Sequence, residues 1–359
     1  MAYMALVLLL IFIAIMLLGI PVGFGMGALT VIAFELLGGD LSMIPQKMFA
    51  GIDTYTYVCI LLFILSADIM SVGGITNAIV VFCEKLVGHI KGGLAHVNVL
   101  ASMLFAGLSG SAAADAAGLG PIEIKMMTDG GYDKEFSSCV TAASAIIGPI
   151  IPPSNIMIIY AGCVGTVSVG KMFLAGAIPG ILLGIAYMIF CYWISVKRKY
   201  PCRKTRATWK EIGHATWETL PALLLPIIIM GTITLGICTA TESSAIAVIY
   251  STIVAACKKN LSIKSFCRAC IRSAKAAANV LFIIAISSAM AWAVTTLGVA
   301  QALTNFCVAY INNKIVFLLF VNVLLLLIGM LLDASPALLL MVPILWPVAK
   351  TLGIDAIHF

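Results

Sequence analysis

Charged residues are scarce in this sequence. Only 10% of its 359 residues are Asp, Glu, Lys or Arg, whereas 62% are hydrophobic. Soluble globular domains carry about 25% charged residues, so this composition excludes an ordinary water-soluble domain and predicts an all-α polytopic membrane protein. A cleaved signal peptide is not indicated either, because no basic residue precedes the first apolar stretch, residues 4–18, which we interpret as a membrane helix.

Paired metal-binding motifs are also missing. The eleven cysteines are scattered, and the CxxC from Cys267 to Cys270 has no second pair. A structural zinc site uses about four Cys or His ligands, so we interpret the cysteines as reduced thiols. The sequence therefore predicts no cofactor and no resident metal.

The few basic residues predict how the chain crosses the membrane. Apolar segments of roughly bilayer-spanning length are expected at 4–18, 22–38, 57–83, 94–120, 138–161, 172–195, 219–237, 241–257, 277–306, 315–332 and 335–352. Most of the Lys and Arg residues lie in the polar stretches between these segments, above all in 197–210 and 258–275. These stretches can all lie on the same side of the membrane. The positive-inside rule assigns these gaps to the cytoplasm. This requires a periplasmic N-terminus and a segment 94–120 that enters and leaves on the cytoplasmic side as a re-entrant hairpin.

The second half of the chain resembles the first. The stretch "LGIPVGFGMGALTVIAF" corresponds to "LGICTATESSAIAVIYS", and Gly107 and Pro121 correspond to Gly329 and Pro343. Because the first half has an odd number of membrane crossings, the second half begins on the opposite side of the membrane, and the repeats are inverted. Inverted repeats with interrupted segments are typical of secondary transporters. Chance similarity between apolar segments is the alternative.

This organisation predicts three parts. They are a first repeat at 1–196 with its hairpin at 94–120, a basic cytoplasmic linker at 197–218, and a second repeat at 219–359 with a hairpin at about 315–352. The linker carries Trp209 and Trp217 among its basic residues, which is typical of a segment that lies on anionic lipid. Because these charges flank membrane helices, the positive net charge does not indicate nucleic-acid binding.

The motif "GPIIPPSN", from Gly148 to Asn155, interrupts the apolar segment 138–161. Each proline inside a helix costs about 3 kcal/mol. Unpaired backbone at membrane depth is tolerated where it is buried or lines a polar cavity. The freed carbonyls can bind a cation, and a half-helix that begins near Ser154 can face an anion. A purely structural kink is the alternative.

Small and polar residues form the expected hairpin tips. In "SGSAAAD", Ser109 and Ser111 offer hydroxyl ligands, and Asp115 is an acid within an apolar segment. In "LDASPA", Asp333 and Ser335 occupy the second tip. Intramembrane acids are functional candidates, with helix capping as the alternative for both.

Two further acids lie in or beside apolar segments. Asp68, in segment 57–83, is either a proton or sodium ligand or the partner of a polar hairpin tip. Glu242 falls at an expected external turn, where helix N-capping is the favoured role.

Several longer motifs together resemble a known family. They are "GGLAHVNVLASMLFAGLSGSAAADAAGLGPI", "GYDKEF", "GPIIPPSNIMIIY", "SVGKMFLAGAIPG" and "LLDASPALLLMVPILWPVAKTLGIDAIHF". Across essentially the whole chain, the sequence resembles the DctM-like large membrane subunit of tripartite ATP-independent periplasmic (TRAP) transporters. The resemblance implies sodium-driven uptake of a small organic acid across the bacterial inner membrane by an elevator movement. It also implies two partners, a periplasmic binding protein and a small four-helix membrane subunit.

The resemblance also implies roles for individual residues. Sodium would be bound by Ser109, Gly110, Ser111, Gly148 and Pro152, and a second sodium ion by Asp333 and Ala334. The substrate would lie against Ser111, Asn155 and Ser335. The family pattern continues beyond "GIDAIHF" with a broken helix and a final crossing, so by this comparison the chain is C-terminally truncated and part of the second sodium site is missing.

Two other functions fit parts of the sequence. A stand-alone sodium–dicarboxylate cotransporter would share the inverted repeat and work without a binding protein. An intramembrane serine protease would use "GLSG" with Ser109 as its nucleophile. Its general base would be His96, but this residue is roughly 20 Å from Ser109 along a helix, which is too far for proton transfer. The sequence therefore predicts a transporter and not an enzyme.

Overall fold

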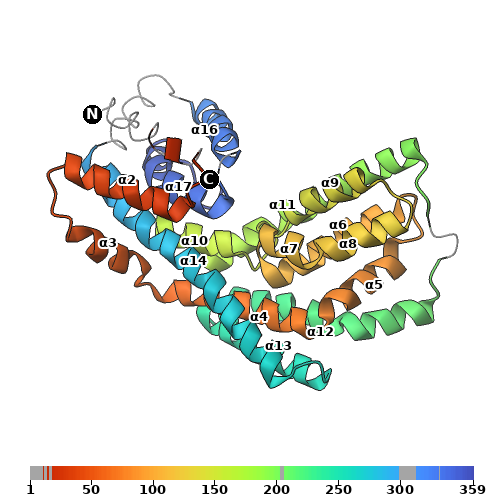
Figure 1. The fold of residues 1–359 in the computed structure, drawn as a ribbon. Coiled ribbons are helices and arrows are strands. Elements are labelled where there is room, and N and C mark those ends of the chain that lie inside the picture. Colours follow the sequence, from red (N-terminus) through yellow and green to blue (C-terminus); the bar gives the residue numbers. More distant parts are fainter. Residues whose placement is uncertain (1–10, 12–13, 16–17, 203–205, 299–312, 331) are drawn as a thin grey trace. The chain divides into compact units, whose positions relative to one another are not determined.

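The described residues fold into helices, without strands, in a computed structural model (Figure 1). These residues are 11, 14–15, 18–202, 206–298, 313–330 and 332–359. Their α-helices are α2 (Val22–Leu36), α3 (Met43–Ile52), α4 (Val58–Val72), α5 (Ile75–Val87), α6 (Gly93–Ser109), α7 (Ala112–Gly118), α8 (Gly120–Asp129), α9 (Lys134–Ala145), α10 (Asn155–Val164), α11 (Val169–Arg198), α12 (Trp209–Thr234), α13 (Ala240–Cys257), α14 (Ile263–Thr296), α16 (Lys314–Gly329) and α17 (Ala334–Thr351).

The predicted all-α polytopic membrane fold is confirmed. Within the described ranges, six helical spans are long and apolar enough to cross a membrane. The predicted crossing at 4–18 lies almost entirely outside the described residues, as does the end of the predicted segment 277–306.

Two compact units make up the chain. Unit 1 comprises Met1–Tyr57, Ile158–Ser168 and Ala276–Phe359, and unit 2 comprises Val58–Met157 and Val169–Lys275. Helices α10 and α14 each contribute residues to both units. Because these units cut across the two predicted repeats, the repeat symmetry stays a prediction.

Aromatic and aliphatic side chains fill the core of unit 1. Phe34 of α2 is fully buried and stacks on Trp292 of α14, with ring centroids 5.0 Å apart. Phe317 of α16 and Leu345 of α17 belong to the same cluster. The apolar faces of four helices are thereby removed from solvent around one core.

Small residues allow close helix packing in unit 2. Ser66 of α4 contacts Ser251 of α13, with hydroxyl oxygens 2.7 Å apart, and α4 lies along α13 (Figure 1). Thr219 of α12 donates a hydrogen bond of 3.0 Å to the Ala78 carbonyl of α5. Such small and hydroxylated residues are common at helix interfaces in membranes.

The structure divides the predicted apolar segment 57–83 into two helices. Helix α4 ends at Val72 and α5 begins at Ile75, after Gly73 and Gly74. Gly74 has a φ of 77°, a left-handed conformation that glycine adopts without strain. The predicted apolar segment is therefore interrupted, since two adjacent glycines end the first helix. The structure also extends α12 back to Trp209, so only the start of the 197–218 stretch connects helices.

The segment predicted as the first hairpin contains two helical arms, and its re-entrant path through a membrane stays a prediction. Helix α6 forms one arm, α7 and α8 form the other, and Gly110 and Ser111 separate them. Polar side chains join α6 to α9. Asn98 donates a hydrogen bond of 2.7 Å to Thr141, and Ser144 donates one of 2.8 Å to the Asn98 amide oxygen.

An ion pair fixes the end of α11 against the start of α9. Arg198 lies 2.8 Å from the Asp133 carboxylate, which also accepts a hydrogen bond from the Tyr200 hydroxyl. The Tyr200 hydrogen bond and the Arg198 charge hold the pKa of Asp133 below its ordinary value. Because its folded pKa is depressed, the stabilisation is present above the unfolded pKa and is lost as pH falls through the folded pKa.

We expect an Asp133→Asn variant to unfold at a lower temperature than the parent near pH 7. The difference should shrink as the pH is lowered to about 3, below the ordinary Asp pKa. Thermal unfolding in detergent between these pH values measures this effect, with Asp129→Asn as a control. A difference that stays constant over the range would contradict the prediction.

Candidate functional site

The tip of the first hairpin packs directly against the break at 148–155. A Cβ atom added to Gly110 would lie 2.3 Å from the Pro153 carbonyl oxygen, and one added to Gly148 would lie 3.2 Å from the Ser111 carbonyl oxygen. The first distance leaves no room for a side chain at Gly110, and the second makes the contact at Gly148 tight. Two segments that sequence analysis assigned to one sodium site are therefore in contact, with backbone carbonyls at their interface.

Ser154 ends the break and begins a new helix. Its hydroxyl accepts a hydrogen bond of 3.3 Å from the Met157 backbone and donates one of 2.5 Å to the Pro149 carbonyl. Helix α10 then starts at Asn155, as the predicted half-helix requires. The first residues of α10 carry backbone N–H groups without intrahelical partners, an arrangement that favours anions.

Two serines of the first tip occupy different environments. Ser109 is 4% exposed, and its hydroxyl has no hydrogen-bond partner in the described part of the chain. Ser111 is partly exposed and N-caps α7 by accepting a hydrogen bond of 3.4 Å from the Ala114 backbone. The capping role considered for Asp115 thus belongs to Ser111.

The second hairpin tip lies in unit 1. Asp333 occupies the N-cap position of α17, is exposed, and makes no side-chain capping hydrogen bond. Ala334 and Ser335 form the first turn of the same helix. The contribution of these residues to sodium and substrate binding stays a prediction.

Asp68 is held by an arginine from a distant part of the chain. Arg272 of α14 contacts both carboxylate oxygens, with nitrogen–oxygen distances of 2.8 and 3.1 Å. Ser273 donates a further hydrogen bond of 2.7 Å. Of the two alternatives for Asp68, the structure favours pairing with a polar partner, although the partner comes from α14 and not from a hairpin tip.

Glu123 is a buried acid that sequence analysis missed. It is 0% exposed, and within the described ranges neither of its carboxyl oxygens has a hydrogen-bond partner. Sequence analysis ended the apolar segment at residue 120 and counted the following residues as a polar gap. The spacing of eight residues between Asp115 and Glu123 could have indicated this acid from the sequence, because it places both residues on one side of a helix.

The sequence is similar to known proteins of one family. The family model of the tripartite ATP-independent periplasmic transporter, DctM component, matches residues 9–359. The sialic acid TRAP transporter large permease protein SiaM of Vibrio cholerae is 40% identical over 344 residues, which cover 95% of this chain and 80% of that protein. The C4-dicarboxylate TRAP transporter large permease protein DctM of Pseudomonas aeruginosa is 36% identical over 333 residues, or 92% of this chain and 77% of that protein.

The chain belongs to the DctM family. The sialic acid TRAP transporter permease protein SiaT of Haemophilus influenzae is another relative, 37% identical over 353 residues, which cover 98% of this chain and 57% of that protein. Family membership confirms the resemblance found in the sequence motifs and the prediction of a transport subunit instead of an enzyme.

The geometry of this DctM-family chain also argues against a serine protease. The His96 ring contacts the Gly92 carbonyl at 2.9 Å and lies edge-on to Tyr192. The Ser109 hydroxyl, at the other end of α6, has no hydrogen-bond partner. These two residues therefore do not form a nucleophile and base pair.

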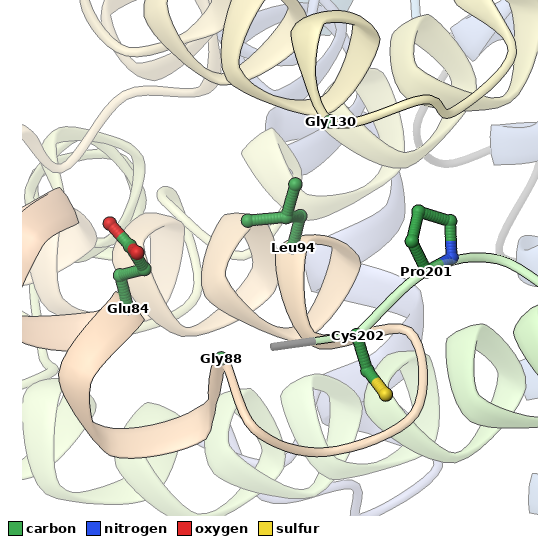
Figure 2. A pocket seen from close by; sticks show the side chains of 6 residues that line it. All are labelled: Glu84, Gly88, Leu94, Gly130, Pro201 and Cys202. Carbon is green, nitrogen blue, oxygen red and sulfur yellow. The ribbon is translucent and has the colours of Figure 1, made fainter. Parts of the chain in front are cut away.

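A cavity lies at the opposite end of α6 from the hairpin tip. It measures about 370 Å³ and is lined by Glu84, Gly88, Leu94, Gly130, Pro201 and Cys202. Figure 2 shows that these residues belong to separate segments of the chain. Leu94 and Ser109 are separated by about 22 Å of helix, so none of the predicted sodium or substrate residues lines this cavity.

Glu242 has the predicted capping role in the DctM-family chain. The Thr239 hydroxyl accepts a hydrogen bond from the Glu242 backbone at 3.3 Å, and Glu242 accepts one from the Thr239 backbone at 2.7 Å. This reciprocal capping box begins α13.

We expect Thr239→Ala to lower the unfolding temperature by about 2 °C without changing the sodium dependence of transport, because the variant loses only a helix cap. Thr208→Ala, in the equivalent capping box of α12, is the matched control. Thermal unfolding and sodium titration of uptake check both expectations. A changed sodium affinity in Thr239→Ala alone would instead indicate an ion-binding role.

Proposed function

We propose that this DctM-family protein carries a small organic acid into the cell, driven by sodium. The observation that carries the proposal is the close packing of the hairpin tip, residues 109–111, against the broken segment 148–153. This contact brings together backbone carbonyls of two irregular segments, with two serines at the tip. Hard oxygen ligands of this kind suit a sodium ion, and irregular backbone inside a membrane is typical of transport sites.

The proposed first sodium site combines residues of both segments. Ser109, Gly110 and Ser111 come from the tip, and Gly148 and Pro152 come from the break. The Ser109 hydroxyl could turn toward an ion, because it has no hydrogen-bond partner among the residues that the structure describes. Asp333 and Ala334 are proposed to contribute to a second sodium site.

The substrate class follows from the charge at the start of α10. The free N–H groups near Asn155 and the hydroxyl of Ser111 can bind a carboxylate, and Ser335 is proposed as a third contact. The names of two relatives refer to sialic acid and C4-dicarboxylates, which are both carboxylates. A small carboxylate is therefore the proposed substrate.

The proposed complex has three components in the bacterial inner membrane. A periplasmic binding protein delivers the acid, a small four-helix membrane subunit supports the permease, and the hairpins move by an elevator mechanism. The membrane potential can contribute about 2.3 kcal/mol per charge for each 100 mV. Entry of sodium ions in excess of the substrate charge would use this energy.

Reconstitution tests this proposal. We would place the chain with its small subunit in liposomes, add the binding protein, impose an inward sodium gradient and measure uptake of labelled sialic acid and C4-dicarboxylates. Uptake that needs both sodium and the binding protein supports the proposal. Sodium-driven uptake without the binding protein would favour a stand-alone cotransporter, and uptake that ignores the sodium gradient would refute sodium coupling.

A further inference from the structure

A long part of the sequence contains no acidic residue. Neither Asp nor Glu occurs between Glu242 and Asp333. Six basic residues nevertheless lie within 258–275, and they are Lys258, Lys259, Lys264, Arg268, Arg272 and Lys275. This stretch connects α13 to α14 and forms the first turns of α14. Its positive charges have no acidic neighbour along the chain, so any negative group that offsets them comes from another segment or from outside the protein.

Helix α14 is longer than a bilayer requires. Its 34 residues extend for about 51 Å, whereas the hydrocarbon core of a membrane is about 30 Å thick. All of its basic residues lie before Ala276, and the remainder of the helix is uncharged. Because a charge in hydrocarbon is costly, we expect the uncharged part to cross the membrane and the basic end to lie among the lipid headgroups.

Three of these basic residues lie along one side of α14. Lys264, Arg268 and Lys275 are separated by four and seven residues, which are the spacings of one helical face. All three are exposed, and within the described ranges no salt bridge involves any of them. These three residues, which we call the basic stripe, therefore form a positively charged surface that the described part of the chain does not neutralise.

The opposite side of α14 is occupied by protein. Ala269 is 1% exposed and belongs to one hydrophobic cluster with Ile69 of α4 and Ala255 of α13. Ser273, one turn further along, is also buried and donates a hydrogen bond of 2.7 Å to Asp68. These contacts hold the basic end of α14 against two neighbouring helices, so the basic stripe faces away from them.

Other charged groups near the basic stripe already have partners. Arg272 pairs with Asp68 at 2.8 Å, and Lys258 donates a hydrogen bond of 3.0 Å to the Glu218 carbonyl. Among the residues that the structure describes, Asp68 is the only acid that forms a salt bridge with the 258–275 stretch. Because Arg272 occupies this acid, the charges of the basic stripe are left for a group outside the chain.

An exposed apolar side chain accompanies the basic stripe. Ile271 is 59% exposed and lies three residues after Arg268 and four before Lys275, on the same side of the helix. The long stems of Lys and Arg are also apolar. A surface that alternates cations with apolar groups suits a molecule that carries a negative headgroup above hydrocarbon chains, and it is less suited to a fully hydrated anion.

We propose that the basic stripe binds the headgroups of anionic phospholipids. Their phosphates contact Lys264, Arg268 and Lys275, and their acyl chains cover Ile271. Charge complementarity identifies this ligand, because lipid phosphates are the negative groups that the basic end of a membrane-crossing helix meets. Bound lipid stabilises the folded protein, since it binds a surface that unfolding destroys. The site is distinct from the lipid contact expected for 197–218, and it does not depend on the function proposed above.

Thermal unfolding in defined bilayers tests the site. We would compare vesicles of zwitterionic phosphatidylcholine with vesicles that also contain phosphatidylglycerol. The parent should unfold at least about 3 °C higher in the anionic vesicles. The variant Lys264→Gln/Arg268→Gln/Lys275→Gln should lose most of this shift. The matched control, Lys125→Gln/Lys134→Gln/Lys171→Gln, removes as many exposed charges from α8, α9 and α11 and should keep it.

A parent protein without the shift would overturn the proposal. Equal losses in the two triple variants would also overturn it, because overall charge and not the basic stripe would then attract the lipid. Soluble glycerol phosphate, added to phosphatidylcholine vesicles, should leave the unfolding temperature of the parent unchanged. If it raised that temperature as much as phosphatidylglycerol does, the surface would bind a soluble anion, and the lipid site would be refuted.

A second measurement decides the proposal if the triple variant of the basic stripe does not fold. Native mass spectrometry counts the phosphatidylglycerol molecules that stay bound to the detergent-solubilised protein. Lys264→Gln and Lys275→Gln should each bind this lipid about fivefold more weakly than the parent, whereas the charge-preserving Lys264→Arg should match the parent. Equal lipid binding by the parent and both glutamine variants would refute the site.

Discussion

Replacing Gly110 with alanine is expected to reduce sodium-driven uptake about 100-fold without preventing membrane insertion. The added Cβ would lie 2.3 Å from the Pro153 carbonyl oxygen and 3.1 Å from the Ser154 Cα. Both atoms belong to the backbone, so they cannot move aside as a flexible side chain would. The tip and the broken segment would have to separate, and a displacement of about 1 Å at a functional site can cost a factor of about 100.

The positive φ of Gly110 complicates this test, because alanine is strained at 58° wherever it occurs. Gly236 provides the matched control. It has a φ of +71°, and no atom lies within 4 Å of its added Cβ. Gly236→Ala therefore carries the backbone strain without the steric clash, and should retain most of the uptake. Equal losses in the two variants would show that strain alone is responsible, and normal uptake by Gly110→Ala would contradict the close packing.

Alanine at Ser111 or at Asn155 is expected to abolish sodium-dependent uptake, with at least about a tenfold loss. Ser111 lies at the hairpin tip, where its carbonyl oxygen faces Gly148. Asn155 is the first residue of α10, immediately after the break. Each substitution removes a polar side chain from one of the two segments while it leaves the apolar surface of the helices unchanged.

The Ser111 hydroxyl also caps α7, so a helix-capping loss must be separated from a binding loss. Ser262 offers this comparison because its hydroxyl accepts a hydrogen bond of 3.1 Å from the Ser265 backbone at the start of α14. We expect Ser262→Ala to transport normally. The measurement is uptake as a function of sodium concentration, normalised to the amount of inserted protein. Unchanged uptake in both Ser111→Ala and Asn155→Ala would refute their place in the site.

Helix breaks and helix caps could be predicted from the sequence alone. Adjacent prolines at 152 and 153 cannot continue a helix, so the break and the new helix at Asn155 followed from the residues themselves. The same holds for the cap formed by Thr239 and Glu242, which needs only a spacing of three residues. The scarcity of charge likewise determined that the chain is a membrane protein.

Contacts between distant residues were decided only by the tertiary structure. Asp68 and Arg272 are 204 residues apart, and no local pattern links them. The burial of Glu123 depends on helices packed around it, so an acid counted with a polar gap became part of the hairpin interior. The contact between Gly110 and Pro153 joins two motifs that only the family resemblance had placed in one site, because no local pattern links them. The sequence thus determined where helices end, because proline, glycine and capping residues act within a few residues of the chain. The tertiary structure decided which of these helix ends lie in contact, because that depends on residues far apart in the sequence.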